Sequence, residues 1–339
     1  MINWTALGTG LSIIAALATF HKTLFMQAMN FKHFDVESKE VKVEHRSFIN
    51  TMLIVIQKTG IVRIDSHVFQ LFARYLTAQF NEANVNFADT RSDPKVEIAK
   101  FCAKHGIDAD VNAVEWEWSK RPRDYANINE FFMRRYKKFA VSSASDLVSP
   151  ATSVVQRFES LEKMDCLVKG ARYTLESCGV PSPEVYADTE CYYFYLSPAD
   201  YHCFHSPLEG TIERIVDITG LGHCSGSVKP DLLDSKPSIL LHNRRFVVVL
   251  RRGSLRVALV IIGGFLVDSV RMSRELKEGR AVEKGQFLGS FALGGSAILM
   301  LTNINLSMVH SLNDAVRNTD LPVKVTAGRE FANVAKESS

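Results

Sequence analysis

The sequence predicts an α+β fold, in which a mainly helical amino-terminal third is followed by a β-rich domain of sandwich or barrel type. Between Phe48 and Phe80, apolar residues recur every three or four positions, which is the spacing of an amphipathic helix. From about Asp146 onward, short apolar runs alternate with Gly, Pro, Asn and Asp, which is typical of strands joined by turns. Because no regular helical segments alternate with these runs, a parallel βαβ sheet is not expected.

Residues 1–30 form a hydrophobic segment that we expect to associate with a membrane. The run from Ala6 to Phe20 carries no charged side chain, and His21 and Lys22 follow it directly. It is shorter than the ~20 apolar residues that span a bilayer, although Trp4 in front of it suits a membrane interface. A buried core helix and a cleavable signal segment stay open as alternative interpretations.

Residues 31–125 are predicted to be mainly helical, and residues 126–339 are predicted to form the β-rich domain. The polar, charged stretch at residues 31–45 is expected to be a solvated connector that precedes the first helix. A second helix is expected from Lys95 to His105, because the glycine that follows it is a typical carboxy-terminal cap.

The overall charge excludes a nucleic-acid-binding protein defined by bulk charge. The 339 residues include 40 Lys and Arg against 37 Asp and Glu, which leaves a net charge of +3. Hydrophobic residues make up 46% of the chain and charged residues 23%, as in ordinary globular proteins.

The cysteines predict neither a disulfide framework nor a metal site. All six lie outside any CxxC pair, so reduced and mostly buried thiols are expected. Cysteine and histidine do occur close together, and the side chains concerned are Cys203, Cys224, His202, His205 and His223. Their spacing does not match that of zinc ligands, and no metal is therefore predicted.

Two short stretches are candidates for chemistry. Gly294, Gly295 and Ser296 interrupt two strand-like apolar runs, and by themselves they indicate either a tight turn or a peptide bond that breaks. His202 and His205 lie three residues apart between two prolines, which favours a loop between strands. A histidine pair in such a loop indicates a site, because imidazole titrates near neutral pH.

Four stretches, in the same order, resemble motifs of the phosphatidylserine decarboxylase family. They are NINEFFMRR (Asn127 to Arg135), LSPADYHCFHSPLEGTI (Leu196 to Ile212), RRFVVVLRRGSLRVALVIIGGFLVDSV (Arg244 to Val270) and EKGQFLGSFALGGSAILML (Glu283 to Leu301). The resemblance covers about the last two-thirds of the chain. It implies that residues 126–339 are a decarboxylase-like catalytic domain.

The resemblance implies that the bond between Gly295 and Ser296 is a self-cleavage site. The Ser296 hydroxyl would attack the Gly295 carbonyl, and the serine would become a pyruvoyl group, so that no external cofactor is needed. The family pattern makes His205 the base for self-cleavage, and it makes His202 the proton donor and substrate contact. The implied reaction is the decarboxylation of phosphatidylserine to phosphatidylethanolamine.

This sequence departs from the family pattern at one position that bears on self-cleavage. The family's aspartate, which would orient the base histidine, falls at Thr152. Asp146 and Asp200 are the nearby carboxylates that could replace it. Because threonine carries no negative charge, we expect self-cleavage to be slow or incomplete.

The expected partners are phosphatidylserine, membrane lipids and the chain's own two fragments, whereas a homodimer stays open and nucleic acid is not expected. The predicted location is membrane-associated: the mitochondrial inner membrane or another internal membrane in a eukaryote, or the cytoplasmic membrane in a bacterium. Two alternatives stay open. One is a family member that does not mature and acts as a lipid-binding or regulatory protein. The other is a serine hydrolase using Ser296 and His205, which the lack of a G-x-S-x-G elbow disfavours.

Overall fold

The computed structural model describes most of the β-rich domain and short parts of the segment before it. The described residues are 30–45, 93–107, 118–121, 124–161, 174–218, 244–263, 269–293, 296–319 and 321–335. Three sequence predictions lie outside these residues, namely the apolar run at 6–20, the helix at 48–80 and the bond between Gly295 and Ser296.

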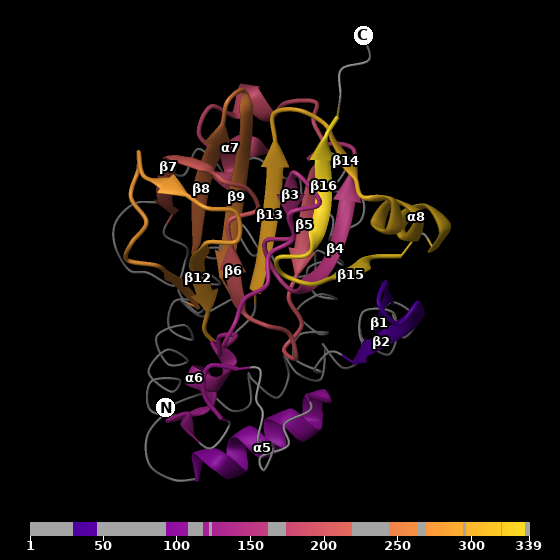
Figure 1. The fold of residues 1–339 in the computed structure, drawn as a ribbon, viewed down its shortest axis with the longest axis vertical. Coiled ribbons are helices and arrows are strands. Elements are labelled where there is room, and N and C mark those ends of the chain that lie inside the picture. The colour runs from indigo at the N-terminus through magenta and orange to yellow at the C-terminus, as the bar shows by residue number, and fades with distance from the viewer. Residues whose placement is uncertain are drawn as a thin grey trace, which may run out of the picture.

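The largest of the described sheets is ten-stranded and almost wholly antiparallel (Figure 1). Its neighbouring strands pair antiparallel, with one parallel exception between β1 and β15. In sheet order the strands are β11 (Ala281–Val282), β7 (Gly210–Ile218), β8 (Arg245–Arg252), β9 (Leu255–Gly263), β13 (Ser296–Thr302), β5 (Cys191–Tyr195), β4 (Ser153–Phe158), β15 (Val323–Val325), β1 (Asn30–Asp35) and β2 (Glu40–His45).

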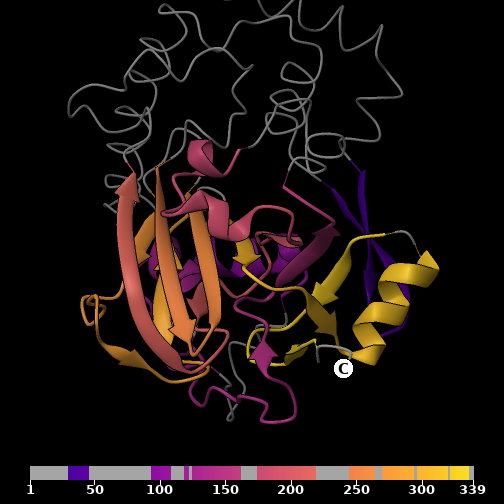
Figure 2. The ribbon, with the colours of Figure 1, turned by 90° about the horizontal axis from the view of Figure 1, so that it is seen from above.

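Two three-stranded sheets and a few helices complete the described fold. One small sheet has the order β10 (Val270–Met272), β12 (Phe287–Phe291), β6 (Cys203–His205), and the other has β14 (Leu306–Met308), β16 (Glu330–Val334), β3 (Leu147–Val148). The helices are α5 (Pro94–His105), α6 (Ile128–Phe132), α7 (Leu175–Cys178), α8 (His310–Thr319) and the 3₁₀ helix η3 (Pro183–Tyr186). Figure 2 places β7 and α8 at opposite sides of the molecule.

The large sheet is covered on both faces, which makes the β-rich domain a layered sandwich. Successive side chains of a strand point to opposite faces, and β13 divides accordingly. Ile298 and Met300 pack with the phenylalanines of the small sheets, among them Phe204 and Phe331, in one core cluster. Leu299 and its neighbours pack in a second cluster with residues of α7 and η3. All seven residues of β13 are buried, which explains the continuous apolar run in the sequence.

The β-rich part of the predicted fold is confirmed, whereas the helical amino-terminal third is not supported. The helix expected from Lys95 to His105 is α5, which begins one residue earlier, at Pro94. Gly106 caps its end in the left-handed conformation, with φ of 63°. The described residues between 31 and 92 form two strands joined by a turn, and none of them is helical.

The prediction of a connector at residues 31–45 is wrong, because these residues belong to the β1–β2 hairpin, although residues 37–43 are exposed as expected. The charged residues of β2 alternate with Val41 and Val43, and this period of two is typical of a strand. The hairpin extends the large sheet, since β1 pairs with β15 and the Phe34 N–H donates to the Pro322 carbonyl at 2.8 Å.

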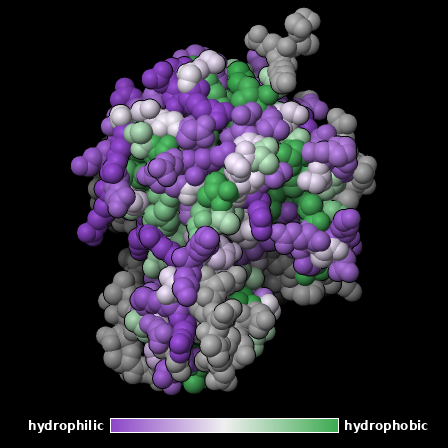
Figure 3. Space-filling model, in the orientation of Figure 1, coloured by the Kyte–Doolittle hydropathy of each residue, from purple (hydrophilic) through white to green (hydrophobic). Residues whose placement is uncertain are grey.

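On the face that Figure 3 shows, the described residues are mostly polar, with apolar side chains in separate small groups. Among the helices that the structure describes, none is long and apolar enough to cross a membrane.

Candidate active site

Both candidate histidines lie at β6, in the segment that joins β5 to β7 (residues 196–209), which we call the histidine segment. His202 directly precedes β6, and His205 is its last residue. The backbone of this segment is held against β12, because the Phe291 N–H donates to the His202 carbonyl at 2.8 Å and His205 pairs with Phe287. The predicted placement between strands is therefore correct for His202, while His205 belongs to a strand.

The ring of His202 is buried and neutral. Its Nδ1 lies 2.8 Å from the carbonyl oxygen of Asp200, so Nδ1 carries the proton and Nε2 carries the lone pair. Burial, together with the nearby charges of Arg134 and Lys324, lowers the pKa of His202 to about 3, against the opposing effect of the hydrogen bond to the Asp200 carbonyl. The ring also lies against Phe132, with 3.7 Å between the ring centroids.

The ring of His205 is held from three sides. Its Nδ1 lies 2.8 Å from the Gly285 carbonyl oxygen, which fixes the proton on Nδ1, and its Nε2 accepts the hydroxyl of Tyr201 at 3.1 Å. The ring of Phe139 stacks on it at 3.8 Å between centroids and 6° between planes. Burial lowers the pKa of His205 to about 4, so this ring too is a neutral hydrogen-bond acceptor at Nε2 near pH 7.

Ser296 is the first residue of β13, where it pairs with Gly263 of β9. Its carbonyl accepts the Leu196 N–H at 3.2 Å, which links it to the start of the histidine segment. The side chain is buried, with 7% of the residue exposed, and its hydroxyl has no hydrogen-bond partner among the described residues. Neither imidazole, as described, is therefore in hydrogen-bond contact with this hydroxyl.

The short helix α6 lies below the sheets (Figure 1), and its side chains contact both the histidine segment and the backbone after β12 that leads to Ser296. The side-chain oxygen of Asn129 accepts the N–H of Leu293, the last described residue before the Gly-Gly pair, at 2.9 Å. Phe132, at the end of the helix, packs against His202. α6 thus connects two parts of the candidate site that lie far apart in the sequence.

Arg134, just beyond α6, is a buried cation bound to backbone carbonyls. Its Nη2 donates to the carbonyls of Ala199 at 2.9 Å and Asp200 at 3.1 Å, and its guanidinium lies over the rings of Trp118 and Phe131. Burial lowers the pKa of Arg134, although arginine stays protonated near neutral pH. The Asp200 carbonyl therefore receives hydrogen bonds from both Arg134 and His202.

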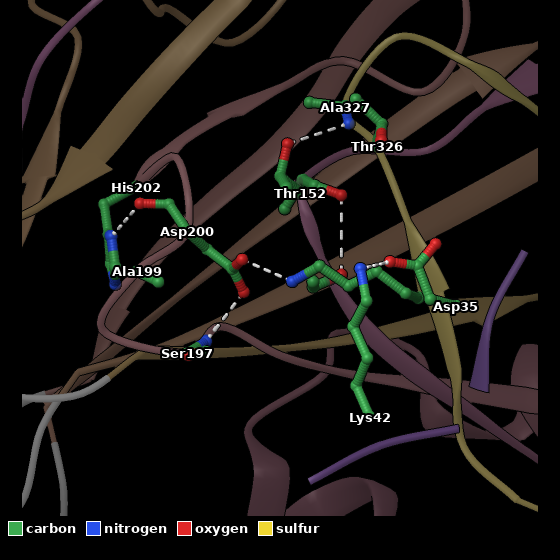
Figure 4. A network of polar contacts seen from close by, with 12 residues as sticks. Asp35, Lys42, Thr152, Ser197, Ala199, Asp200, His202, Thr326 and Ala327 are labelled. Atoms are coloured by element: carbon green, nitrogen blue, oxygen red, sulfur yellow. Dashed lines mark hydrogen bonds and ion pairs between the residues drawn. The ribbon is translucent and has the colours of Figure 1, made fainter. Parts of the chain in front are cut away.

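The two hydrogen bonds of the His205 ring go to Tyr201 and Gly285 and not to Thr152, whose own contact is shown in Figure 4. The Thr152 hydroxyl oxygen accepts the Ala327 N–H at 3.1 Å. The two carboxylates considered as replacements are occupied elsewhere. Asp200 accepts the Ser197 N–H at 2.8 Å and forms an ion pair with Lys324, whereas Asp146 accepts the Val334 N–H at 3.0 Å. The orienting contact of His205 is instead the backbone carbonyl of Gly285.

The described residues contain no group of three or more side chains arranged to hold a metal ion. Cys203 is buried within the domain, and burial raises the pKa of its thiol to about 11, so it is neutral near pH 7. Cys224 and His223, which were considered with it, lie outside the described residues.

Sequence reasoning missed the groups that hold the two rings and the backbone at Leu293. Gly285, Tyr201 and Arg134 act through contacts with His205 or with the Asp200 carbonyl, and Gly285 lies 80 residues from His205 in the chain. Asn129 and Arg134 both lie within the NINEFFMRR stretch, so that motif was the available signal. It did not indicate which atoms these side chains would meet.

A family model described as phosphatidylserine decarboxylase matches residues 128–333, more than half of the chain. The chain is 34% identical over 187 residues to phosphatidylserine decarboxylase proenzyme 2 of Oryza sativa subsp. japonica, covering 52% of this chain and 29% of that protein. It is 29% identical over 249 residues to the phosphatidylserine decarboxylase proenzyme of Fusobacterium nucleatum, covering 70% and 81%. Identity to the Saccharomyces cerevisiae proenzyme 2 is 33% over 208 residues, which span 59% of this chain and 18% of that protein.

The two buried imidazoles predict a loss of stability in mild acid. Their pKa values of about 3 and 4 in the folded chain lie below the ordinary 6.5, so their contribution is complete above pH 6.5 and is lost as the pH falls toward the folded values. As the pH falls through that window, each ring lowers the free energy of unfolding by at most about 1.4 kcal/mol per pH unit. Urea midpoints at pH 7 and pH 5 should differ less for His205→Asn than for the parent chain. The parent chain and the His205→Asn chain both carry Ser296→Ala, so that each is compared as a single uncut chain. An equal pH dependence in the two chains would contradict a neutral, buried His205.

Proposed function

Because this chain belongs to the phosphatidylserine decarboxylase family, we propose that it is a proenzyme that cleaves itself and then decarboxylates phosphatidylserine to phosphatidylethanolamine. The observation that carries this proposal is the Ser296 hydroxyl. It is buried at the first position of a central strand, it directly follows two glycines, and it has no hydrogen-bond partner among the described residues. Buried hydroxyls are nearly always hydrogen-bonded, so one without a partner suits a reacting group.

In the proposed maturation, the Ser296 oxygen attacks the carbonyl carbon of Gly295. The new C–O bond forms as the C–N bond breaks, so the amino group of Ser296 is released and the two fragments are joined by an ester. Loss of the Ser296 α-proton then expels the Gly295 carboxylate and leaves a dehydroalanine. Addition of water and departure of ammonia convert this residue to a pyruvoyl group. The change removes a hydroxyl that lacks a partner, so the residue fits its proposed role as precursor.

The pyruvoyl ketone would draw electrons from the bond to the substrate's carboxylate and so make carbon dioxide a leaving group. No added cofactor is proposed. The protein's part is to hold the substrate and move protons.

The neutral rings define what each histidine can do. His205 presents its lone pair at Nε2 and is proposed to accept the proton of the Ser296 hydroxyl during self-cleavage. This requires Nε2 to leave the Tyr201 hydroxyl, and such contacts often form only in the reacting complex. His202 is proposed to contact the substrate. Because it is neutral, its Nε2 must first take up a proton before returning one to the α-carbon.

We propose that the chain works at a membrane surface, because its substrate resides in a bilayer. We propose that the uncharged run at residues 6–20 attaches the chain to the membrane. The membrane would be the mitochondrial inner membrane or another internal membrane in a eukaryote, and the cytoplasmic membrane in a bacterium. A homodimer stays a compatible assembly.

The first test concerns self-cleavage. Under denaturing conditions the purified protein should separate into two chains, Met1 to Gly295 and Ser296 to Ser339, and the smaller should have a blocked amino terminus. Ser296→Ala should remain one chain, because alanine has no hydroxyl to attack the carbonyl. Ser290→Ala is the matched control, since Ser290 is equally buried at 7% exposure. Intact-mass analysis that finds only the full-length wild-type chain would favour a lipid-binding role without maturation.

The two histidines should have separable roles. His205→Ala should block cleavage because it removes the proposed base. His202→Ala should still mature but lose decarboxylation, measured as release of carbon dioxide from phosphatidylserine per cleaved chain. His310→Ala is the control, because the side chain of His310 is 91% exposed on α8. If His202→Ala blocks cleavage while His205→Ala matures normally, the two assignments are reversed.

Thr152→Asp distinguishes a carboxylate from a carbonyl as the orienting group of His205. The sequence alone predicts faster maturation of this variant, whereas we expect no change, because the side chain at position 152 bonds to the Ala327 N–H and makes no hydrogen bond to the His205 ring. Pulse-chase rates of the wild type, Thr152→Asp and the uncharged Thr152→Asn provide the comparison. Faster maturation of the aspartate variant alone would show that the missing charge limits the reaction.

Deletion of residues 1–30 tests membrane attachment. We expect the shortened chain to be released from membranes by a salt wash that leaves the full-length chain bound, because electrostatic contacts alone are screened by salt. Equal retention of the two chains after the wash would rule out this segment as the attachment.

A further inference from the structure

We propose that Asn129 is a positioning residue for self-cleavage, whose side-chain oxygen holds the backbone that leads into the bond between Gly295 and Ser296. This inference rests on the proposed function above. The contact that carries it is the hydrogen bond from the Leu293 N–H to Asn129 Oδ1, at 2.9 Å. Leu293 is two residues before Gly295, and it lies 164 residues from Asn129 in the sequence.

The helix that carries Asn129 is fixed at its start by a pair of side-chain contacts. The side chain of Asn127 accepts the Glu130 N–H at 2.8 Å, and Glu130 in turn accepts the Ala126 N–H at 2.7 Å. The first contact satisfies a backbone donor that a helix leaves unpaired at its first turn, and the second fixes the chain just before the helix. Lys120 also forms an ion pair with Glu130. Asn129 is thus set on a braced turn of helix and does not depend on a loop for its position.

The other end of α6 is fixed to the histidine segment. Phe131 and Phe132 are buried, at 0% and 2% exposure, and Phe132 lies against His202. Arg134 donates to the carbonyls of Ala199 and Asp200. Since these contacts join α6 to the segment that carries both imidazoles, Asn129 places Leu293 in a defined relation to the proposed base and acid.

The scissile turn is therefore held on both sides by contacts of different kinds. Before the turn, Asn129 holds Leu293, and the Ala292 N–H donates to the Ser269 carbonyl at 2.6 Å. After the turn, Ser296 is held by strand pairing with Gly263. Attack of a hydroxyl on the preceding carbonyl needs the two atoms at about 3–3.5 Å in a defined orientation, and a displacement of about 1 Å can slow a reaction about 100-fold. The Asn129 contact therefore restricts the backbone before the two glycines, whereas the backbone after them is restricted by the pairing of β13.

The contact affects maturation rate more than stability. One net hydrogen bond contributes little to the stability of a folded domain, and the helix itself stays braced at both ends without it. A variant that lacks the acceptor should therefore fold and retain its unfolding midpoint, while its glycine turn samples more conformations. This separation allows the positioning role to be measured.

The experiment compares three variants by the first-order rate at which one chain becomes two in a pulse-chase. Asn129→Leu is close in size and has no acceptor, so it should mature at least about tenfold more slowly. Asn129→Asp keeps the acceptor oxygen and should mature within about threefold of the wild type. Asn333→Leu is the matched control, because the Asn333 side chain accepts the Asp146 N–H at the same 2.9 Å, on β16. It should mature at the wild-type rate.

Asn129→Ala and the urea midpoint of each chain guard against misfolding. A slow Asn129→Leu with a normal midpoint, together with rescue by Asn129→Asp, supports the role. Wild-type rates for Asn129→Leu and Asn129→Ala, or an Asn129→Asp as slow as the leucine variant, would overturn it while leaving the proposed function intact. A wild-type chain that never cleaves would overturn the proposed function and this role together.

Discussion

The pairing of β13 with two neighbours is the constraint on which the candidate site depends. β13 pairs with β9 along all seven of its residues and with β5 along five. Because strand register is fixed wherever both faces are buried, the first residue of this strand cannot slide. Ser296 is that residue. The large sheet thus sets the position of its carbonyl and of its side chain. The two residues before it are glycines, which have no side chain to pack.

The same pairing explains how a chain could be cut before Ser296 and stay assembled. The segment after the proposed cut supplies β13 and β15 to the large sheet, and it supplies β14 and β16 to a small one. Ile298 and Met300 pack in the main core cluster, and Phe331 of β16 packs there as well. Loss of one peptide bond leaves all these contacts in place. The fragments would be separated by denaturant but not by dilution, since their interface is the core itself.

Backbone carbonyls, not carboxylates, determine the state of both imidazoles. Each ring donates from Nδ1 to a carbonyl, His202 to that of Asp200 and His205 to that of Gly285, which leaves Nε2 as the acceptor in both. Burial and the neighbouring cations keep the rings neutral, as their lowered pKa values indicate. Arg134 has a second effect at His202, because it shares the Asp200 carbonyl and so fixes that acceptor in place. The outcome is two neutral rings at β6, each of which presents Nε2 as a hydrogen-bond acceptor.

The sequence predicted the β-rich domain and the candidate residues, because their signals are local. Short apolar runs between turn residues predict strands, and the four motifs each lie in one stretch of chain. The hairpin at residues 30–45 was missed because a high charge outweighed an alternation of only two valines. The contacts of His205 and Leu293 could not be predicted, since their partners, Gly285 and Asn129, lie 80 and 164 residues away. No pattern along the chain records such contacts.

The predicted replacement of the family's aspartate by Thr152 is compatible with the proposed self-cleavage once the two effects of a carboxylate are separated. A carboxylate orients the imidazole, and it also stabilises the imidazolium that forms when the ring takes a proton. The Gly285 carbonyl orients the imidazole, but as a neutral dipole it stabilises the imidazolium only weakly. The pKa of His205 accordingly stays at about 4. In a serine protease triad, loss of the aspartate slows turnover about 10⁴-fold. Maturation, however, happens once per molecule. If a step that otherwise takes seconds is slowed by that factor, it still finishes within about a day. A reaction that occurs once per molecule therefore tolerates a weaker base than a reaction of many turnovers does.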